Sequence, residues 1–492
     1  MKDRNNPSNS KRTTGNCFRW FVSIAILTFL PMIAAVAKAQ TDPDPAWVTQ
    51  AKAATVGTDV SSTDVVITES TGDGNPTTYT VKTATGLAWI AWVTNKGKTH
   101  PEITTTSEPN YDSFYPAKAG FEDCAVELAD NISLALPTEL NTVGDTNDSW
   151  VPIGYLSHKF KGTFNGNNKT ITDLSITEEY TDYNAIGLFG RIEGGSINNL
   201  TVEGKIELGS YATSSTKFIG GIVGYSEGNI NNCHNKCTID YGSAGENYEI
   251  NVGGIVGKID YTNCSITNCS NQGKISGTKG KYCYIGGIVG IATINSKALS
   301  NCFNSGEIDA TATAYVAGGI AGSNSMQLSN CYSTGAVKAK VNDSNSENSC
   351  YAGGIAGINN KTITNCYSTG AVSATHSGKS DTYNSNSCCA GGIAGSSSSQ
   401  TTISNCLALN KSAADGSPAI SVTVTNGISI KMGRVVGNYY TGSSSNASYN
   451  TKLSNNYAST LTTMPDNYTY DKATDKKKTA QIFIWKIIFP IS

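Results

Sequence analysis

The chain has 492 residues, of which 50 are glycine, 38% are hydrophobic and only 15% are charged, and its formal net charge is -2. This hydrophobic fraction is enough to build a core and excludes a disordered polyelectrolyte. Residues 1–39 carry six basic side chains and one acidic one, so the rest of the chain has a net charge of -7. A mildly acidic chain has no electrostatic attraction for nucleic acid or for an anionic membrane, and nucleic-acid binding is the least favoured class.

The first 39 residues have the pattern of a signal peptide. A basic stretch precedes an apolar run over 21–36, and Ala37-Lys38-Ala39 supplies the small-x-small pattern of a signal-peptidase site. An uncleaved anchor is the alternative, because 18–36 is almost long enough to span a bilayer. Cleavage is favoured, and we expect no contact with a membrane beyond this leader. The predicted destination is outside the cell or at its surface, with the periplasm as the remaining alternative.

The stretch between the leader and the repeats has a weaker pattern. Residues 40–78 are rich in Thr, Asp and Gly and predict a small β-rich segment. Residues 85–93 have apolar side chains at helical spacing and predict a short helix that caps the N-terminal end of the repeats. Residues 121–176 predict several strands, so that 79–176 would hold the cap helix and the opening coils.

A glycine phrase, Gly-x-x-Gly in most copies, recurs eight times with steps of 32 to 42 residues between its closing glycines. Steps that lengthen towards the C-terminus indicate loop insertions into a solenoid. Each copy continues with an Ile-x-Asn-Cys-like phrase and most with Gly-x-Ile or Gly-x-Val, which predicts three strands per coil and an all-β solenoid over 177–460. Glycine permits both the close approach of stacked backbones and a positive φ at corners. The closing glycines are Gly190, Gly224, Gly257, Gly290, Gly322, Gly357, Gly395 and Gly437.

These phrases carry a family resemblance. Gly-Leu-Phe-Gly at 187–190, Gly-Gly-Ile-Val/Ala-Gly in later copies and the Ile-x-Asn-Cys phrase resemble the GLUG repeat of secreted bacterial proteins, known from adhesins and from the non-catalytic part of IgA-cleaving metalloproteases. Residues 160–171 resemble the coil that commonly precedes these repeats. The resemblance spans 80–460 and implies a right-handed parallel β-helix of about eight coils in an extracytoplasmic location. It implies no reaction, because a fold alone does not carry a function.

Six of the 14 cysteines occupy one equivalent position of the repeat, directly after an asparagine. The first copy places Leu200 there and the last, in our alignment, Tyr457, so the position is predicted to be a buried apolar column of free thiols. Export makes disulfides the alternative for some cysteines, for instance Cys233 with Cys237 or Cys264 with Cys269. The asparagine is expected to stack in an amide column or to take a left-handed corner conformation. This predicted cysteine ladder consists of Cys233, Cys269, Cys302, Cys331, Cys366 and Cys406.

No constellation of catalytic or metal-ligating residues accompanies the repeats in the sequence. The four histidines are isolated, there is no His-Glu-x-x-His zinc-protease motif, and the glycine phrases lack the aspartate of calcium-binding repeats. His234, beside Cys233, is expected to point to solvent. The acidic residues near the first copy, Asp182 and Glu193 among them, fit a solvated loop. We therefore predict no catalytic residue, no cofactor and no metal site.

A binding or structural role remains. Loops at 340–352 and 374–390 are rich in Asn, Ser and Tyr, which suit carbohydrate or protein contacts. We predict an exported, non-enzymatic repeat protein that presents an elongated surface for adhesion to an unknown protein or carbohydrate ligand. A structural spacer or matrix component is the first alternative. A carbohydrate-active β-helix enzyme is the second, although the repeats are poor in the matched outward carboxylates that it would need. Residues 461–492 resemble a shortened terminal cap, or else a truncated end.

Overall fold

The computed structural model describes residues 46–458 apart from several short gaps. The chain divides into two compact units, Met1–Pro45 and Ala46–Ser492, and all described residues belong to the second. The predicted leader and the predicted C-terminal segment 461–492 therefore lie outside the described residues. The gaps are 71–75, 100–114, 136–148, 156, 178–183, 212–215, 245–247, 263, 279, 294–296, 313–314, 342–348, 378–386, 413–417, 425–427 and 440–451.

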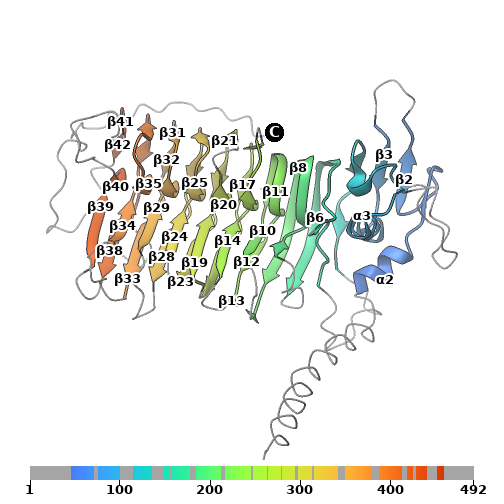
Figure 1. Ribbon diagram of the computed structural model, residues 1–492, viewed down its shortest axis with the longest axis horizontal. Coiled ribbons are helices and arrows are strands. Elements are labelled where there is room, and N and C mark those ends of the chain that lie inside the picture. Colours follow the sequence, from blue (N-terminus) through green and yellow to red (C-terminus); the bar gives the residue numbers. More distant parts are fainter. Residues whose placement is uncertain are drawn as a thin grey trace, which may run out of the picture. The chain divides into compact units, whose positions relative to one another are not determined.

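Within the described residues, two α-helices precede the repeat coils, α2 (Ala46–Lys52) and α3 (Ala84–Lys96) (Figure 1). The Thr83 hydroxyl accepts a hydrogen bond from the Gly86 N–H at the start of α3, and Gly97 ends the helix with a φ of 62°. The short helix predicted near 85–93 is therefore confirmed. The described part of 40–78 contains the helix α2 as well as strands. This helix was not predicted, because seven residues are too few to show a helical period.

The helix α3 is buried along most of its length and its aromatic residues join the core of the solenoid. Ring centroids lie 6.3 Å apart between Trp89 and Phe121, and 6.2 Å apart between Phe121 and Phe160. The Phe160 ring lies 5.4 Å from that of Phe189 in the first repeat copy. The helix therefore covers the end of the solenoid with an apolar core that continues into the first repeat coil.

Within the described residues, three strands lie between α2 and α3, and three more lie between α3 and the first repeat copy. The pair β2–β3 is antiparallel, whereas β1–β2, β3–β4, β4–β6 and β5–β6 are parallel. The strands predicted within 121–176 are β4, β5 and β6. The elements are β1 (Val56–Gly57), β2 (Val65–Thr68), β3 (Thr78–Val81), the 3-10 turn η2 (Ala119–Phe121), β4 (Ala125–Leu128), β5 (Ile132–Ser133) and β6 (Thr163–Thr177).

The eight repeat copies stack as parallel coils, and each strand pairs with the equivalent strand of the next copy (Figure 1). The strand that leads into each glycine phrase belongs to one eight-stranded sheet. Six coils lie between two other repeat coils, and the first and last copies bound the stack. The eight strands are β7 (Ala185–Ile186), β10 (Lys217–Gly220), β14 (Glu249–Gly253), β19 (Tyr282–Gly286), β24 (Tyr315–Gly318), β29 (Cys350–Gly353), β34 (Ser387–Gly391) and β39 (Ser429–Gly433).

Four further strand positions complete a coil. The second holds β15 (Val256–Ile259), β20 (Val289–Ala292), β25 (Ala321–Asn324), β30 (Ala356–Asn359), β35 (Ala394–Ser397) and β40 (Val436–Tyr439). The third holds β16 (Ser265–Thr267), β21 (Ala298–Ser300), β26 (Gln327–Ser329), β31 (Thr362–Thr364), β36 (Thr402–Ser404) and β41 (Lys452–Ser454). The fourth holds β17 (Ser270–Asn271), β22 (Phe303–Asn304), β27 (Tyr332–Ser333), β32 (Tyr367–Ser368), β37 (Leu407–Ala408) and β42 (Tyr457–Ala458).

The fifth position holds β12 (Thr238–Asp240), β18 (Ile275–Thr278), β23 (Ile308–Ala312), β28 (Val337–Val341), β33 (Val372–His376) and β38 (Ile420–Val424). In the first two copies, long bent strands pass through several positions: β8 (Phe189–Glu207) and β11 (Val223–Asn235). A separate pair consists of β9 (Ser210–Tyr211) and β13 (Ser243–Ala244).

The prediction of a parallel β-solenoid is confirmed, but a coil has five short strands where three were predicted. Two of the predicted strands contain a corner. In the third copy, β14 ends at Gly253 and β15 begins at Val256, while Asn268 with a φ of 56° separates β16 from β17. In the sequence the residues of each corner follow their neighbours without a gap, so the two strands on either side were predicted as one.

Candidate binding surfaces

The closing glycines lie where adjacent coils approach each other. A Cβ atom on Gly322 would lie 2.6 Å from the carbonyl oxygen of Gly290 and 2.6 Å from the backbone nitrogen of Ile285. None of the eight glycines, all within the described residues, has a positive φ. The close approach of backbones therefore explains these glycines, and the expected role at left-handed corners is wrong for them.

The six ladder cysteines form an interior column. All are buried free thiols, and Leu200 is in register with Cys233. The Sγ of Cys302 donates a hydrogen bond to the Ser300 carbonyl at 3.2 Å, and the backbone N–H of Cys302 lies 3.4 Å from the Cys331 sulfur. A site that holds Leu or Cys in successive coils is a packing site.

In the last copy the ladder position is occupied by Asn456, and the prediction of Tyr457 there is wrong. Asn456 follows Cys406 in the ladder, because its Oδ1 accepts a hydrogen bond from the Cys406 backbone N–H at 3.0 Å. Tyr457 instead pairs with Leu407, one residue further along and on the outer side of the coil. The last copy therefore ends the apolar column with an amide.

The other cysteines also pack as small apolar residues. Cys283, Cys350 and Cys388 share an inward column with Tyr315 and Ile430. All 13 described cysteines are free, so the disulfides considered for Cys233 with Cys237 and for Cys264 with Cys269 are not formed in this structure.

Burial predicts that these thiols react slowly. It raises the pKa of Cys237 and of Cys389 to about 12, because the thiolate would lose its hydration. We expect Ellman's reagent at pH 8 to leave the described thiols of the native chain unmodified, and to modify all 13 in guanidinium chloride. Rapid modification of several thiols without unfolding would contradict the buried ladder.

The corner asparagines before the ladder position meet both expectations at once. Their φ angles lie between 52° and 56°, in the left-handed region. Their amides are also bonded from coil to coil, as in the 2.9 Å hydrogen bond from Asn232 Nδ2 to Asn199 Oδ1 and the 3.2 Å bond from Asn301 Nδ2 to Asn268 Oδ1. Asparagine suits these corners because it tolerates the left-handed conformation and because its amide forms a hydrogen bond with the equivalent amide of the next coil.

A second amide column, inside the core, was missed by the sequence analysis. The Nδ2 of Asn271 donates to the Asn304 Oδ1 at 2.8 Å and to the Gly273 carbonyl at 2.9 Å, and its own Oδ1 accepts from Asn235 at 2.7 Å. Ser333 and Ser368 continue the column in the next copies. A buried Asn or Ser two residues after five of the six ladder cysteines was the available signal; Ala408 follows Cys406 at that position.

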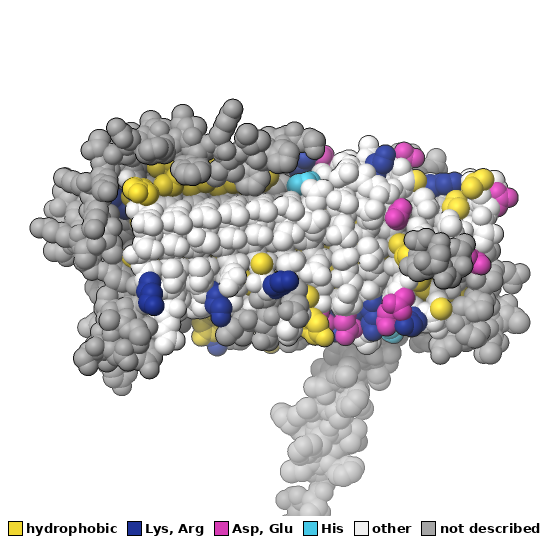
Figure 2. All heavy atoms as spheres, turned by 90° about the horizontal axis from the view of Figure 1, so that it is seen from above, with side chains coloured by type: hydrophobic (Ala, Val, Ile, Leu, Met, Phe, Trp, Pro, Cys, Tyr) yellow, Lys and Arg dark blue, Asp and Glu magenta, His cyan; other side chains and the backbone are white. Residues whose placement is uncertain are grey.

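The outer side of the third strand position carries an uncharged column, which we call the polar face. Its residues are half-exposed or exposed and lie in register, and some bond to each other, as Thr267 does to Asn231 at 2.8 Å. In the view onto this side, white rows of backbone and uncharged side chains follow the stack (Figure 2). The polar face consists of Asn198, Asn231, Thr267, Ser300, Ser329, Thr364, Ser404 and Ser454.

An apolar column lies beside the polar face, just past the asparagine corner. The rings of Phe303 and Tyr332 are parallel with centroids 5.1 Å apart, and those of Tyr332 and Tyr367 are parallel at 4.8 Å. Figure 2 shows hydrophobic side chains in a line along the white rows. This aromatic stripe consists of Phe303, Tyr332, Tyr367, Leu407 and Tyr457.

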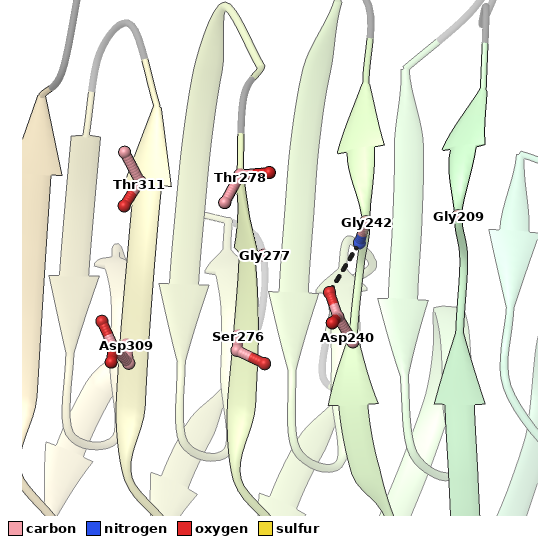
Figure 3. A pocket seen from close by; sticks show the side chains of 8 residues that line it. All are labelled: Gly209, Asp240, Gly242, Ser276, Gly277, Thr278, Asp309 and Thr311. Atoms are coloured by element: carbon pink, nitrogen blue, oxygen red, sulfur yellow. Dashed lines mark hydrogen bonds between the residues drawn. The ribbon is translucent and has the colours of Figure 1, made fainter.

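A shallow groove of about 460 Å³ runs across the outer side of the fifth strand position (Figure 3). Asp240 pairs with Ser276, which pairs with Asp309, so the two carboxylates stand in one column two coils apart. Glu207 precedes Asp240 in the same column. The repeats therefore do carry outward carboxylates at matched positions, which the sequence analysis did not expect.

Two of the polar residues singled out in the sequence have structural partners. His234 does not point freely to solvent: its Nδ1 lies 2.8 Å from the Ser270 hydroxyl, and burial lowers its pKa. Glu193 pairs with Lys159 and Lys161, each at 3.6 Å. Asp182 lies outside the described residues, as does most of the loop stretch within 340–352 and 374–390.

The described residues contain no group of three or more His, Cys, Asp or Glu side chains that could hold a metal ion. Among the described helices, none has the length and apolar character required to cross a bilayer.

Comparison with known proteins identifies the repeat. Residues 248–276 match the family model of the GLUG motif. The chain carries the GLUG motif. The matched residues begin one position before β14 and end within β18, so one GLUG motif corresponds to one coil of five strands.

No curated protein matches the chain. Among solved structures, a Bacteroides ovatus protein described as a "putative immunoglobulin A1 protease" is similar, with 17% identity and a TM-score of 0.42. The similarity covers 79% of this chain and 89% of that protein. The description belongs to that protein alone.

Proposed function

We propose that this GLUG-repeat protein is exported and non-enzymatic, and that it binds a host protein or a glycan through the outer side of its coils. The observation that carries the proposal is the polar face, where uncharged hydrogen-bonding side chains repeat in register over eight copies. Such side chains contribute adaptable contacts at low desolvation cost. The leader pattern of residues 1–39 supports export.

The groove is the feature that favours the enzymatic alternative. Asp240 and Asp309 are separated by two strand spacings, about 10 Å in all, which is at the upper limit for a pair of glycosidase carboxylates. The groove between them is open to solvent, whereas acid–base catalysis gains from a site that excludes water. The geometry therefore favours binding over turnover.

The experiment for this proposal is a screen of the purified chain against a glycan array and a panel of host extracellular proteins. We expect saturable binding to at least one ligand, without release of shortened glycan. Absence of any binding would contradict the proposal and favour the spacer alternative.

The Asp240→Asn/Asp309→Asn variant tests the alternative directly. Because we assign these carboxylates no catalytic role, we expect glycan chain length after incubation to be the same with the variant and with the unmodified chain. Polysaccharide cleavage by the unmodified chain that disappears in the variant would establish an enzyme.

A further inference from the structure

We propose that the polar face and the aromatic stripe together bind an extended neutral polysaccharide, laid along the stack with about one sugar per coil. This inference rests on the proposed binding function and names its ligand class and its surface. The ligand would be an uncharged β-linked hexose polymer.

The polar face is periodic. Every coil offers the same kind of group at the same place, for example Ser300, Ser329 and Thr364 in three successive copies. These side chains recur at the spacing of parallel strands, about 4.8 Å. An extended β-linked sugar chain presents its hydroxyls at a similar interval, whereas the surface of a protein without repeats does not.

The polar face carries no charged side chain. Every residue of the polar face is an asparagine, a serine or a threonine. Charged side chains gather elsewhere, as in the 2.7 Å ion pair between Lys338 and Glu307 at the fifth strand position. Neutral donors and acceptors suit sugar hydroxyls, whereas an anionic polymer would need basic residues on the same face.

The aromatic stripe gives the polar face an apolar border. Leu407 is 37% exposed and Tyr457 is 45% exposed, and both continue the column of stacked rings at Tyr332 and Tyr367. Pyranose rings have hydroxylated edges and apolar C–H faces. A sugar chain could therefore bond to the polar face and cover part of the aromatic stripe at the same time.

The test measures sedimentation of the full chain with insoluble cellulose and chitin, and retention on a gel of polygalacturonate as the anionic probe. The Ser329→Glu/Thr364→Glu variant places two charges in adjacent coils of the polar face. The Ser373→Glu/Ser421→Glu variant is the matched control, because it places two charges in adjacent coils of one outward column at the fifth strand position. Both variants carry a similar repulsion between paired carboxylates, and their urea midpoints are compared first.

We expect the unmodified chain and the control to bind cellulose or chitin, and the polar-face variant to bind about tenfold more weakly or less. The Tyr332→Ser/Tyr367→Ser variant should also lose binding. Three results would overturn the inference: binding to neither neutral polymer, equal binding by both charge variants, or binding only to polygalacturonate. If the chain binds a host protein in the screen but no neutral polymer, the inference fails while the proposed function stands.

Discussion

The Gly322→Val variant is expected to lose about 3 kcal/mol of folding free energy, or to accumulate as aggregate. Valine would bring its Cβ within 2.6 Å of backbone atoms of Gly290 and Ile285, which belong to the preceding coil. Backbone of packed coils cannot move aside without breaking pairing between strands. The expected measurement is the urea concentration at half-unfolding, followed by circular dichroism.

The control is Ser323→Val, one residue further along. Ser323 is partly exposed on β25, where a β-branched side chain is favourable, so its midpoint should change little. Equal midpoints for Gly322→Val and Ser323→Val would contradict the explanation of the closing glycines by close backbone approach.

The free energy of unfolding of the Asn271→Ala variant is expected to fall by about 2–4 kcal/mol, because the substitution would remove three hydrogen bonds in the core. The Gly273 carbonyl, the Asn304 amide oxygen and the Asn235 amide nitrogen would each lose a partner. The measurement is the same urea midpoint, with differential scanning calorimetry as a second readout.

Two further substitutions make this prediction specific. Asn271→Ser should lose less stability than Asn271→Ala, since serine occupies the equivalent position of later coils at Ser333 and Ser368. Thr267→Ala, in the same coil but on its outer side, should cost less than 1 kcal/mol, by the usual size of surface effects. If Asn271→Ala were as stable as Thr267→Ala, the interior amide column would not contribute to stability.

The fold was predictable because every coil repeats the same signals. The glycine phrase, the Asn-Cys phrase and the alternation between them predicted parallel coils, and the capping helix followed from the spacing of Leu87, Trp89, Ile90 and Val93. The corner at Asn268 could not be placed as readily. At this corner Thr267 and Asn268 both face outwards before the buried Cys269, so the alternation shifts by one residue and one predicted strand became two.

The candidate surfaces were harder to predict because they depend on register between coils. The residues around Asp240 differ from those around Asp309, and only the strand pairing through Ser276 shows that the two carboxylates share a column. The aromatic stripe left a signal that was not used, since Phe303, Tyr332, Tyr367 and Leu407 each directly follow a ladder cysteine. The error at Tyr457 shows the limit: a shift of one residue moves a side chain from the core to the surface.

The most direct test of the proposed function is where the chain resides. An antibody raised against the purified chain would be applied to intact and to permeabilised cells of the organism that produces it, with a cytoplasmic protein as the permeability control. We expect strong labelling of intact cells, because the proposed function requires the outer side of the coils to lie where a host ligand can reach it. Labelling only after permeabilisation would contradict the proposed function.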